Sequence, residues 1–119
     1  MIRVYIASPY TKPEGCEQEN VDRSFAVAIK LIEYGFAPYP PLYSHYLHLM
    51  KPQAFETWMK LDMEWVQQCD CLLRLKGESY GADREVEFAQ DQGMPVFRNV
   101  DDLIDFYSSV EEVLSHVDS

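Results

Sequence analysis

The sequence predicts an α/β fold in which helices cover a mostly parallel β-sheet. Two observations lead to this prediction. Short apolar runs alternate along the chain with longer segments of helical periodicity, a pattern typical of consecutive β-α-β units. At 119 residues, the chain has the length of one ordinary domain, which can bury a core without disulfides or metals. We therefore expect residues 1–119 to form a single domain.

The first half of the chain contains two of the predicted strands. Residues 2–7 form the first strand, residues 8–15 a polar loop, and the next segment a helix that ends at Gly35. Apolar side chains at helical spacing are expected on the core face of that helix: Val21, Phe25, Ala28, Ile29 and Ile32. Residues 36–39 form the second strand. Since the prolines at 38, 40 and 41 cannot donate to a neighbouring strand, we expect this strand at an edge of the sheet.

The second half supplies two more strands. After a long loop over residues 40–52, the pattern predicts a helix over residues 53–68. Residues 70–75 form the third strand, and their nearly continuous apolar character indicates a central position. A helix over residues 82–92, capped by Gly93, leads to a fourth strand at residues 95–97 and to a closing acidic amphipathic helix at residues 101–116.

The expected strand order places the candidate site. With right-handed crossovers, an order of 2-1-3-4 brings the loops after the first and third strands together where the winding direction reverses, the usual ligand site of such sheets. The two loops supply these candidate binding residues: Ser8, Pro9, Tyr10, Thr11, Ser79, Tyr80 and Gly81. Hydroxyls at strand ends often serve only as turn formers or helix caps. Because the two loops face each other, we favour phosphate or sugar binding.

Glu85 is the leading catalytic candidate. It lies one turn inside the helix that follows the loop containing Gly77, Ser79 and Gly81. Glycines let backbone N–H groups approach a ligand closely, and a helix N-terminus attracts anions. A carboxylate held beside a bound anion is suited to act as a nucleophile.

Asp62 is the second acidic candidate. It follows Trp58 by four residues, so both side chains project from one face of the predicted helix. An Asp on a helix is usually a solvated surface residue. Here Trp58, Leu61 and Trp65 predict a largely buried helix, and an Asp at the margin of such a helix is a functional candidate.

Tyr5, His45 and His48 have simple structural explanations as well. Core packing is the ordinary role of a tyrosine such as Tyr5 in a buried strand. His45 and His48 are three residues apart, but a metal site would need further ligands that the sequence does not offer, so loop packing is favoured. We predict no metal and no cofactor.

Charge and cysteine content restrict the partners. Twenty acidic and ten basic side chains give a formal charge of −10, which opposes nucleic-acid binding and favours a small-molecule ligand. The three cysteines lack the spacing of a zinc site and are interpreted as reduced thiols. With no leader and no apolar stretch near 18 residues, the chain is expected to be soluble and cytoplasmic, without a membrane partner.

Three motifs together resemble a known family. They are Val4-Tyr5-Ile6-Ala7-Ser8-Pro9-Tyr10, Trp58-x-x-x-Asp62, and Ser79-x-Gly81-x-x-x-Glu85-x-x-x-Ala89-x-x-x-Gly93-x-Pro95-Val96. The combination resembles the nucleoside 2-deoxyribosyltransferase superfamily, in particular a small, largely uncharacterised bacterial and phage branch close to the nucleoside 5′-monophosphate N-glycosidases. The resemblance covers residues 2 to about 97.

The resemblance implies a fold, a reaction and roles for single residues. The fold is a flavodoxin-like (Rossmann-like) three-layer α/β structure with four or five parallel strands in the order 2-1-3-4(-5), and the protein is a homodimer that binds a nucleotide or nucleoside. Glu85 matches the nucleophile that attacks C1′, Asp62 an aspartate that contacts the base, and Tyr5 a tyrosine near the nucleophile. Ser8 and Gly81 belong to loops that line the sugar and phosphate.

Two departures from the transferases favour hydrolysis over base exchange. Six residues before the nucleophile the transferases carry an aspartate, which would repel a phosphate, whereas Ser79 can bind one. The transferases also send a C-terminal segment with active-site residues into the neighbouring subunit, whereas residues 101–119 offer an acidic helix. We therefore expect hydrolysis of a (deoxy)nucleoside 5′-monophosphate, with His45, Tyr43 and Tyr46 shaping the choice of base.

Other classes of protein are alternatives. A base-exchanging deoxyribosyltransferase keeps the same chemistry, and a catalytically silent nucleotide-binding module keeps only the pocket. A flavodoxin-like electron carrier fits the size and acidity, since Ser8–Thr11 could hold a flavin phosphate. A phosphoacceptor receiver domain needs an acidic cluster and a late Lys, for which Arg98 is a poor substitute.

Overall fold

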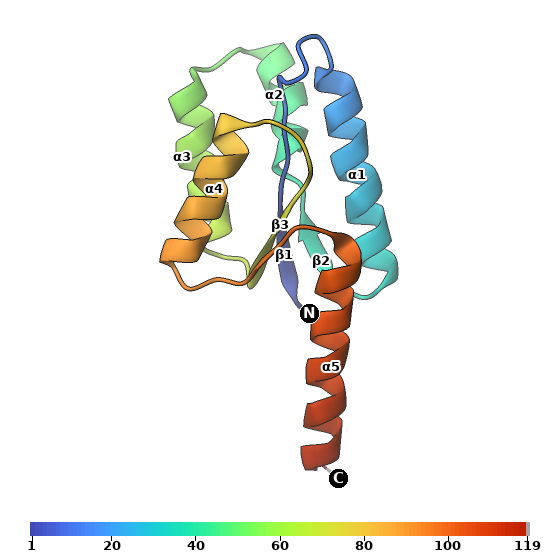
Figure 1. Ribbon diagram of the computed structural model, residues 1–119. Coiled ribbons are helices and arrows are strands. Elements are labelled where there is room, and N and C mark those ends of the chain that lie inside the picture. The colour runs from blue at the N-terminus through green and yellow to red at the C-terminus, as the bar shows by residue number, and fades with distance from the viewer. Residues whose placement is uncertain (119) are drawn as a thin grey trace.

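The computed structural model describes residues 1–118, and the side chains of residues 1–109. The described chain folds into helices and strands that alternate as the sequence predicts (Figure 1). In chain order the elements are β1 (Arg3–Ala7), α1 (Glu17–Glu33), β2 (Ala37–Tyr39), the 3-10 helix η1 (Pro41–Tyr43), α2 (Ser44–Met50), α3 (Phe55–Val66), β3 (Cys71–Arg74), α4 (Tyr80–Asp91), β4 (Val96–Phe97) and α5 (Val100–Asp118).

The sheet has four parallel strands in the order β2-β1-β3-β4. Val4 of β1 pairs with Pro38 of β2 on one side and with Cys71 of β3 on the other. This confirms the expected order, the edge position of β2 and the central position of β3. Residues 1–118 contain no fifth strand. The α/β, flavodoxin-like prediction is therefore confirmed in its four-stranded form.

Side chains alternate along each strand and build one core on each face of the sheet. Val4 and Ile6 point towards α1 and α5, where they meet Leu31 and Leu103. Tyr5 and its neighbours on the other face pack against Val66 of α3 and against Ala82, Val86 and Ala89 of α4. In Figure 1, α3 and α4 lie on one side of the sheet and α1 and α5 on the other, which makes three layers.

The core face of α1 differs from the predicted one. Its buried side chains include Val21, Ser24, Ala28 and Leu31, whereas Ile29 and Ile32 are each 57% exposed. The prediction for these two isoleucines was wrong. The side chains that α1 buries in this part are those of Ser24, Ala28 and Leu31. The Ser24 hydroxyl donates to the carbonyl of Val21 at 2.8 Å, so it is satisfied without water.

The segment predicted as a long loop over residues 40–52 contains two short helices. Pro41 stands at the first position of η1, where a missing N–H is tolerated, and α2 follows directly. The prolines were used only to place the second strand at an edge of the sheet, and here one of them also begins a helix. The closing helix was expected over residues 101–116 and runs as Val100–Asp118.

The three cysteines, Cys16, Cys69 and Cys71, are free thiols. In the part of the chain that the structure describes, no helix is both long and apolar enough to cross a membrane. The side chain of Asn99 accepts from the N–H of Asp102 at 2.8 Å and thereby caps the start of α5.

Gly77, in the loop after β3, packs against Pro9, in the loop after β1. Its φ of +125° lies in a region that only glycine adopts readily, and a Cβ there would approach Pro9 Cγ to 2.9 Å. Gly93, by contrast, has a φ of +74° and no atom within 4 Å of such a Cβ. The contact between Gly77 and Pro9 therefore sets how closely the two loops approach.

We predict that Gly77→Ala lowers the free energy of unfolding by about 2–4 kcal/mol, because backbone strain and a steric clash add. Gly93→Ala is the matched control and is expected to lower it by about 1 kcal/mol through strain alone. Urea denaturation measures both values. Equal losses in the two variants would show that the Pro9 contact is unimportant.

Candidate active site

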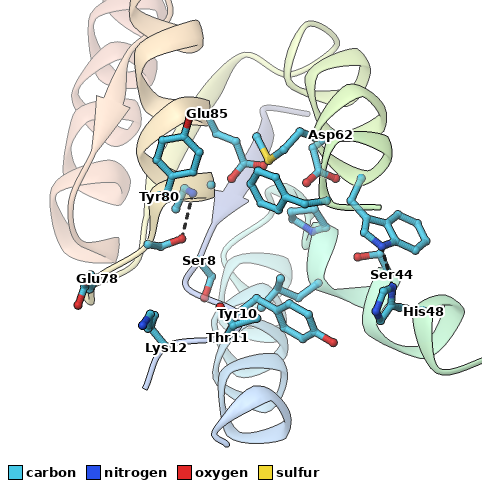
Figure 2. Close-up of a pocket in the computed structure, with 18 residues that line it drawn as sticks. Ser8, Tyr10, Thr11, Lys12, Ser44, His48, Asp62, Glu78, Tyr80 and Glu85 are labelled. Atoms are coloured by element: carbon cyan, nitrogen blue, oxygen red, sulfur yellow. Dashed lines mark hydrogen bonds between the residues drawn. The ribbon is translucent and has the colours of Figure 1, made fainter. Parts of the chain in front are cut away.

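A cavity of about 250 Å³ opens at the carboxyl ends of β1 and β3, where the winding of the sheet reverses. The loops after these two strands form one side, and η1, α2, α3 and α4 form the rest. Figure 2 shows Glu85 near the middle of the cavity wall, with Asp62 and His48 on one side and Lys12 and Glu78 on the other. The loops that sequence analysis expected to face each other do so.

Glu85 is buried at the cavity wall, with only 4% of its surface exposed. Ala82, Val86 and Ala89 anchor α4 on the sheet and turn Glu85 inward. The hydroxyl of Tyr5, a fully buried residue of β1, donates to Glu85 Oε2. Tyr5 is thus not only a core residue: it lies behind the carboxylate and supplies its hydrogen bond.

Asp62 lines the same cavity from α3. Met59 and Val66 are the buried side chains of this helix, and Asp62 lies between them on the same stripe. Trp65 is 42% exposed, and Leu61 is also exposed, so the prediction that Trp58, Leu61 and Trp65 form the buried face was wrong. Asp62 therefore lies in the middle of the buried face of α3 and not at its margin.

The two carboxyl groups share one electrostatic environment. Burial raises the pKa of Asp62 to about 7, and an interaction with Glu85 opposes the rise. Burial and the charge of Asp62 raise the pKa of Glu85 well above its ordinary value, while the Tyr5 hydrogen bond and the charge of Arg74 lower it. The two carboxyl groups therefore titrate as a coupled pair and share protons at pH values where ordinary carboxyl groups are ionised. Burial also raises the pKa of Tyr5, which keeps it a hydrogen-bond donor.

Arg74 is a buried cation at the end of β3, 5% exposed. Its guanidinium donates to the carbonyls of Leu75 and Gly77 and to Asp83 Oδ1 at 3.0 Å. It thereby ties the loop after β3 to the first turn of α4. A lone arginine in an apolar strand is the sequence signal of such a buried polar network.

The start of α4 has free hydrogen-bonding capacity. Ser79 is the N-cap: its Oγ accepts from the N–H of Ala82 at 3.0 Å, which leaves the hydroxyl proton free to donate. The N–H groups of Tyr80 and Gly81 belong to the first turn, where no carbonyl of the same helix can accept from them. A Cβ on Gly81 would lie 3.4 Å from Met59 Sδ and would narrow the cavity.

Much of the remaining cavity wall is aromatic and apolar. Phe55, Trp58, Met59, Pro41 and Leu42 line it. His48 Nδ1 accepts from Trp58 Nε1 at 2.9 Å and from the N–H of Gln53 at 3.2 Å, which places the proton of the neutral ring on Nε2. Phe55, Met59, Pro41 and Leu42 were missed as site residues. No sequence pattern showed that a helix follows Pro41, and the predicted helix over residues 53–68 did not indicate that Phe55 and Met59 face a cavity.

Other predicted site residues lie around the cavity rather than in its wall. Pro9 is buried against Gly77 and lines a neighbouring hollow. His45 is buried and its Nδ1 shares a 2.6 Å hydrogen bond with the hydroxyl of Tyr10, so it positions a wall residue. Tyr43 accepts a hydrogen bond from Tyr39, and Tyr46 is exposed. The wall itself contains Ser8, Tyr10, Asp62, Ser79, Gly81 and Glu85.

Metal binding has no support in the described residues, which contain no group of three or more potential metal ligands. The fold and the cavity define a flavodoxin-like α/β protein with two interacting carboxyl groups at the switch point of its sheet. Within this class, the family model "Domain of unknown function (DUF7768)" matches residues 2–99. The chain belongs to that family. No curated protein has a sequence that matches this chain.

Solved structures of two transferases share the fold. A 2-deoxyribosyltransferase from Leishmania mexicana superposes with a TM-score of 0.60 at 14% identity, over 81% of this chain and 62% of its own. The chain therefore spans less than two thirds of that enzyme. A 2-deoxyribosyltransferase from Bacillus psychrosaccharolyticus superposes with a TM-score of 0.56 at 22% identity, over 79% of this chain and 69% of its own.

We predict that Asp62→Asn removes part of the pH dependence of stability. The folded protein keeps a proton on Asp62 up to about pH 7, whereas the unfolded chain releases it near pH 4. The free energy of unfolding should therefore fall as pH rises from about 4 to about 7, at up to about 1.4 kcal/mol per pH unit for one proton.

Urea denaturation at a series of pH values measures this effect as the difference between the wild type and Asp62→Asn. The variant is expected to be the more stable protein at pH 8, because it buries no carboxylate. Asp91→Asn, an exposed change on α4, is the control and should leave the profile unaltered. Parallel profiles for wild type and Asp62→Asn would contradict the shared proton.

Proposed function

We propose that this protein hydrolyses the N-glycosidic bond of a (deoxy)nucleoside 5′-monophosphate to free base and sugar 5-phosphate. The observation that carries the proposal is the buried Glu85, which Tyr5 holds beside Asp62 in the wall of the cavity. Two carboxyl groups, one ionised and one protonated, are what a two-step displacement at C1′ requires. A cytoplasmic location and a homodimeric state are part of the same proposal.

In the first step the Glu85 carboxylate attacks C1′ of the sugar. The bond between C1′ and the base nitrogen breaks, and its electron pair leaves with the base. Asp62 in its protonated form donates a proton to the departing base, a role that suits a carboxyl group whose pKa is raised to about 7. The Tyr5 hydrogen bond favours the ionised form of Glu85, the form that attacks.

In the second step water attacks C1′ and Glu85 departs as a carboxylate. Asp62, now ionised, takes the proton from the attacking water, which restores the starting state of the pair. The net reaction adds one water across the glycosidic bond. It needs no redox partner.

The phosphate fits the end of the cavity that contains Ser79 and Lys12, away from His48 and from Trp58, which donates to His48. The free hydroxyl proton of Ser79 and the N–H groups at the start of α4 suit an anion, and Ser8 and Lys12 line the same region. Trp58 suits the flat face of a base. A nucleotide laid in this direction brings its C1′ near Glu85.

Base exchange between nucleosides is the second candidate. The observation that favours it is the fold shared with two 2-deoxyribosyltransferases, one of which is described as a biocatalyst for nucleoside synthesis. Exchange would use the same step at Glu85, with a second base in place of water. A silent nucleotide-binding module would use neither step.

We predict that the wild type releases free base from at least one member of a panel of ribo- and deoxyribonucleoside 5′-monophosphates, and that Glu85→Gln lowers kcat/KM at least about 10³-fold by removing the nucleophile. Chromatographic detection of the free base measures this. Glu87→Gln, the same change at an exposed position of α4, is the control and should retain activity. Release that requires an added acceptor base would establish the transferase instead, and nucleotide binding without turnover would establish the silent module.

We predict that Ser79→Asp changes the preferred substrate from monophosphate to nucleoside. The aspartate still caps α4, but its charge repels the phosphate, so kcat/KM for the monophosphate should fall about 10–100-fold. Ser79→Asn caps the helix without a charge and should lose much less. If Ser79→Asp and Ser79→Asn lose the same factor in kcat/KM for the monophosphate, charge at position 79 does not select the phosphate.

A further inference from the structure

A second cavity of about 250 Å³ adjoins the first. It is formed by the loop after β1, the first turns of α1 and the loop after β3. Lys12 and Glu78 line both cavities. In Figure 2 these two residues lie together at the end of the first cavity, away from Asp62 and His48. The second cavity therefore continues the first beyond its phosphate end.

Positive charge gathers in this second cavity although the protein is acidic. Three of the ten basic residues of the chain line it, Lys12, Arg23 and Lys76, together with one carboxylate, Glu78. None of the three cations forms an ion pair with any side chain that the structure describes; the ion pairs there belong to Lys30, Arg74 and Arg84. Three unpaired cations in a protein of formal charge −10 indicate a site for an anion.

The loops that carry two of these cations are held in place. Asn20, a buried residue of α1, donates through Nδ2 to the carbonyls of Tyr10 and Lys12, both at 2.9 Å. Arg74 donates to the carbonyl of Gly77 at 2.8 Å, next to Lys76. Because these contacts fix the backbone of both loops, little ordering of the backbone is needed on binding.

We infer that the second cavity binds the β-phosphate of a nucleotide whose base and sugar occupy the first, so that the substrate class extends to nucleoside 5′-diphosphates. This inference rests on the proposed function, because it uses the direction in which the nucleotide lies. With the base at Trp58, beside His48, and the first phosphate at Ser79, the chain of phosphates leads towards Lys12 and then to Arg23 and Lys76. The reaction stays the same: water adds across the glycosidic bond and the products are base and sugar 5-diphosphate.

The test measures binding separately from turnover. In the Glu85→Gln protein, which is designed not to consume its ligand, calorimetry gives the affinities for deoxynucleoside 5′-mono- and 5′-diphosphates with each of the four bases. We expect the diphosphate to bind about tenfold more tightly than the monophosphate of the same base, because the added phosphate gains charge-assisted hydrogen bonds. Adding Arg23→Ala or Lys76→Ala should bring this ratio close to one.

Two further variants test whether charge in the cavity causes the preference. Lys30→Ala removes the same kind of charge from the last turn of α1, away from the cavity, and should leave the ratio at its starting value. Glu78→Gln removes the one carboxylate and should raise the ratio a few-fold. A ratio of one in the parent, or equal ratios in the parent and in Arg23→Ala and Lys76→Ala, would overturn the inference.

The outcome also separates this inference from the proposed function. Base release from monophosphates together with a ratio of one would overturn the β-phosphate subsite and leave the hydrolysis intact. A ratio of ten that depends on Arg23 and Lys76, without base release from any nucleotide, would support the subsite and overturn the hydrolysis. Absence of binding by every nucleotide would overturn both.

Discussion

The hydrogen bond from Tyr5 to the buried carboxyl of Glu85 is the contact on which the rest of the site depends. A carboxylate removed from water is unfavourable unless donors and a nearby cation replace the water. The central strands provide both, since Tyr5 belongs to β1 and Arg74 ends β3. Tyr39 stacks on Tyr5 with ring centroids 5.8 Å apart and fixes the ring of the donor. Glu85 thus depends on the packing of the sheet, so that the core and the site are one structure.

The topology explains why everything else meets at the same edge. The connection after β1 leads to one edge of the sheet and the connection after β3 leads to the other, so the loops that begin these connections face each other. Here Gly77 and Pro9 bring the two loops into contact. Asn20 and Arg74 then fix the two loops through backbone carbonyls. The donors at the start of α4 and the cations beside them are therefore held by the fold itself, before any ligand binds.

Much of this arrangement could be predicted from the sequence because it follows from periodicity and topology. The strand order, the edge position of β2 and the inward face of Glu85 are of this kind. The failures have a common physical origin in side chains that contradict their usual preferences. Ser24 is buried because it bonds its own helix, Ile29 is exposed, and Pro41 starts a helix instead of preventing one. Because η1 and α2 were not predicted, neither was the part of the cavity wall that Pro41, Leu42 and Ser44 form.

The charge distribution resolves the conflict between an acidic protein and an anionic ligand. At contact distance the potential depends on the nearest groups, because salt screens charges beyond about 10 Å. Near the switch point these groups are the N-terminus of α4, three cations and one carboxylate: Lys12, Arg23, Lys76 and Glu78. Exposed acidic residues such as Asp91 and Asp101 lie on outward helix faces. The net charge therefore slows the approach of an anion without opposing its binding. A surface of negative net charge and a pocket lined by cations are compatible, and together they agree with the proposed small phosphorylated ligand.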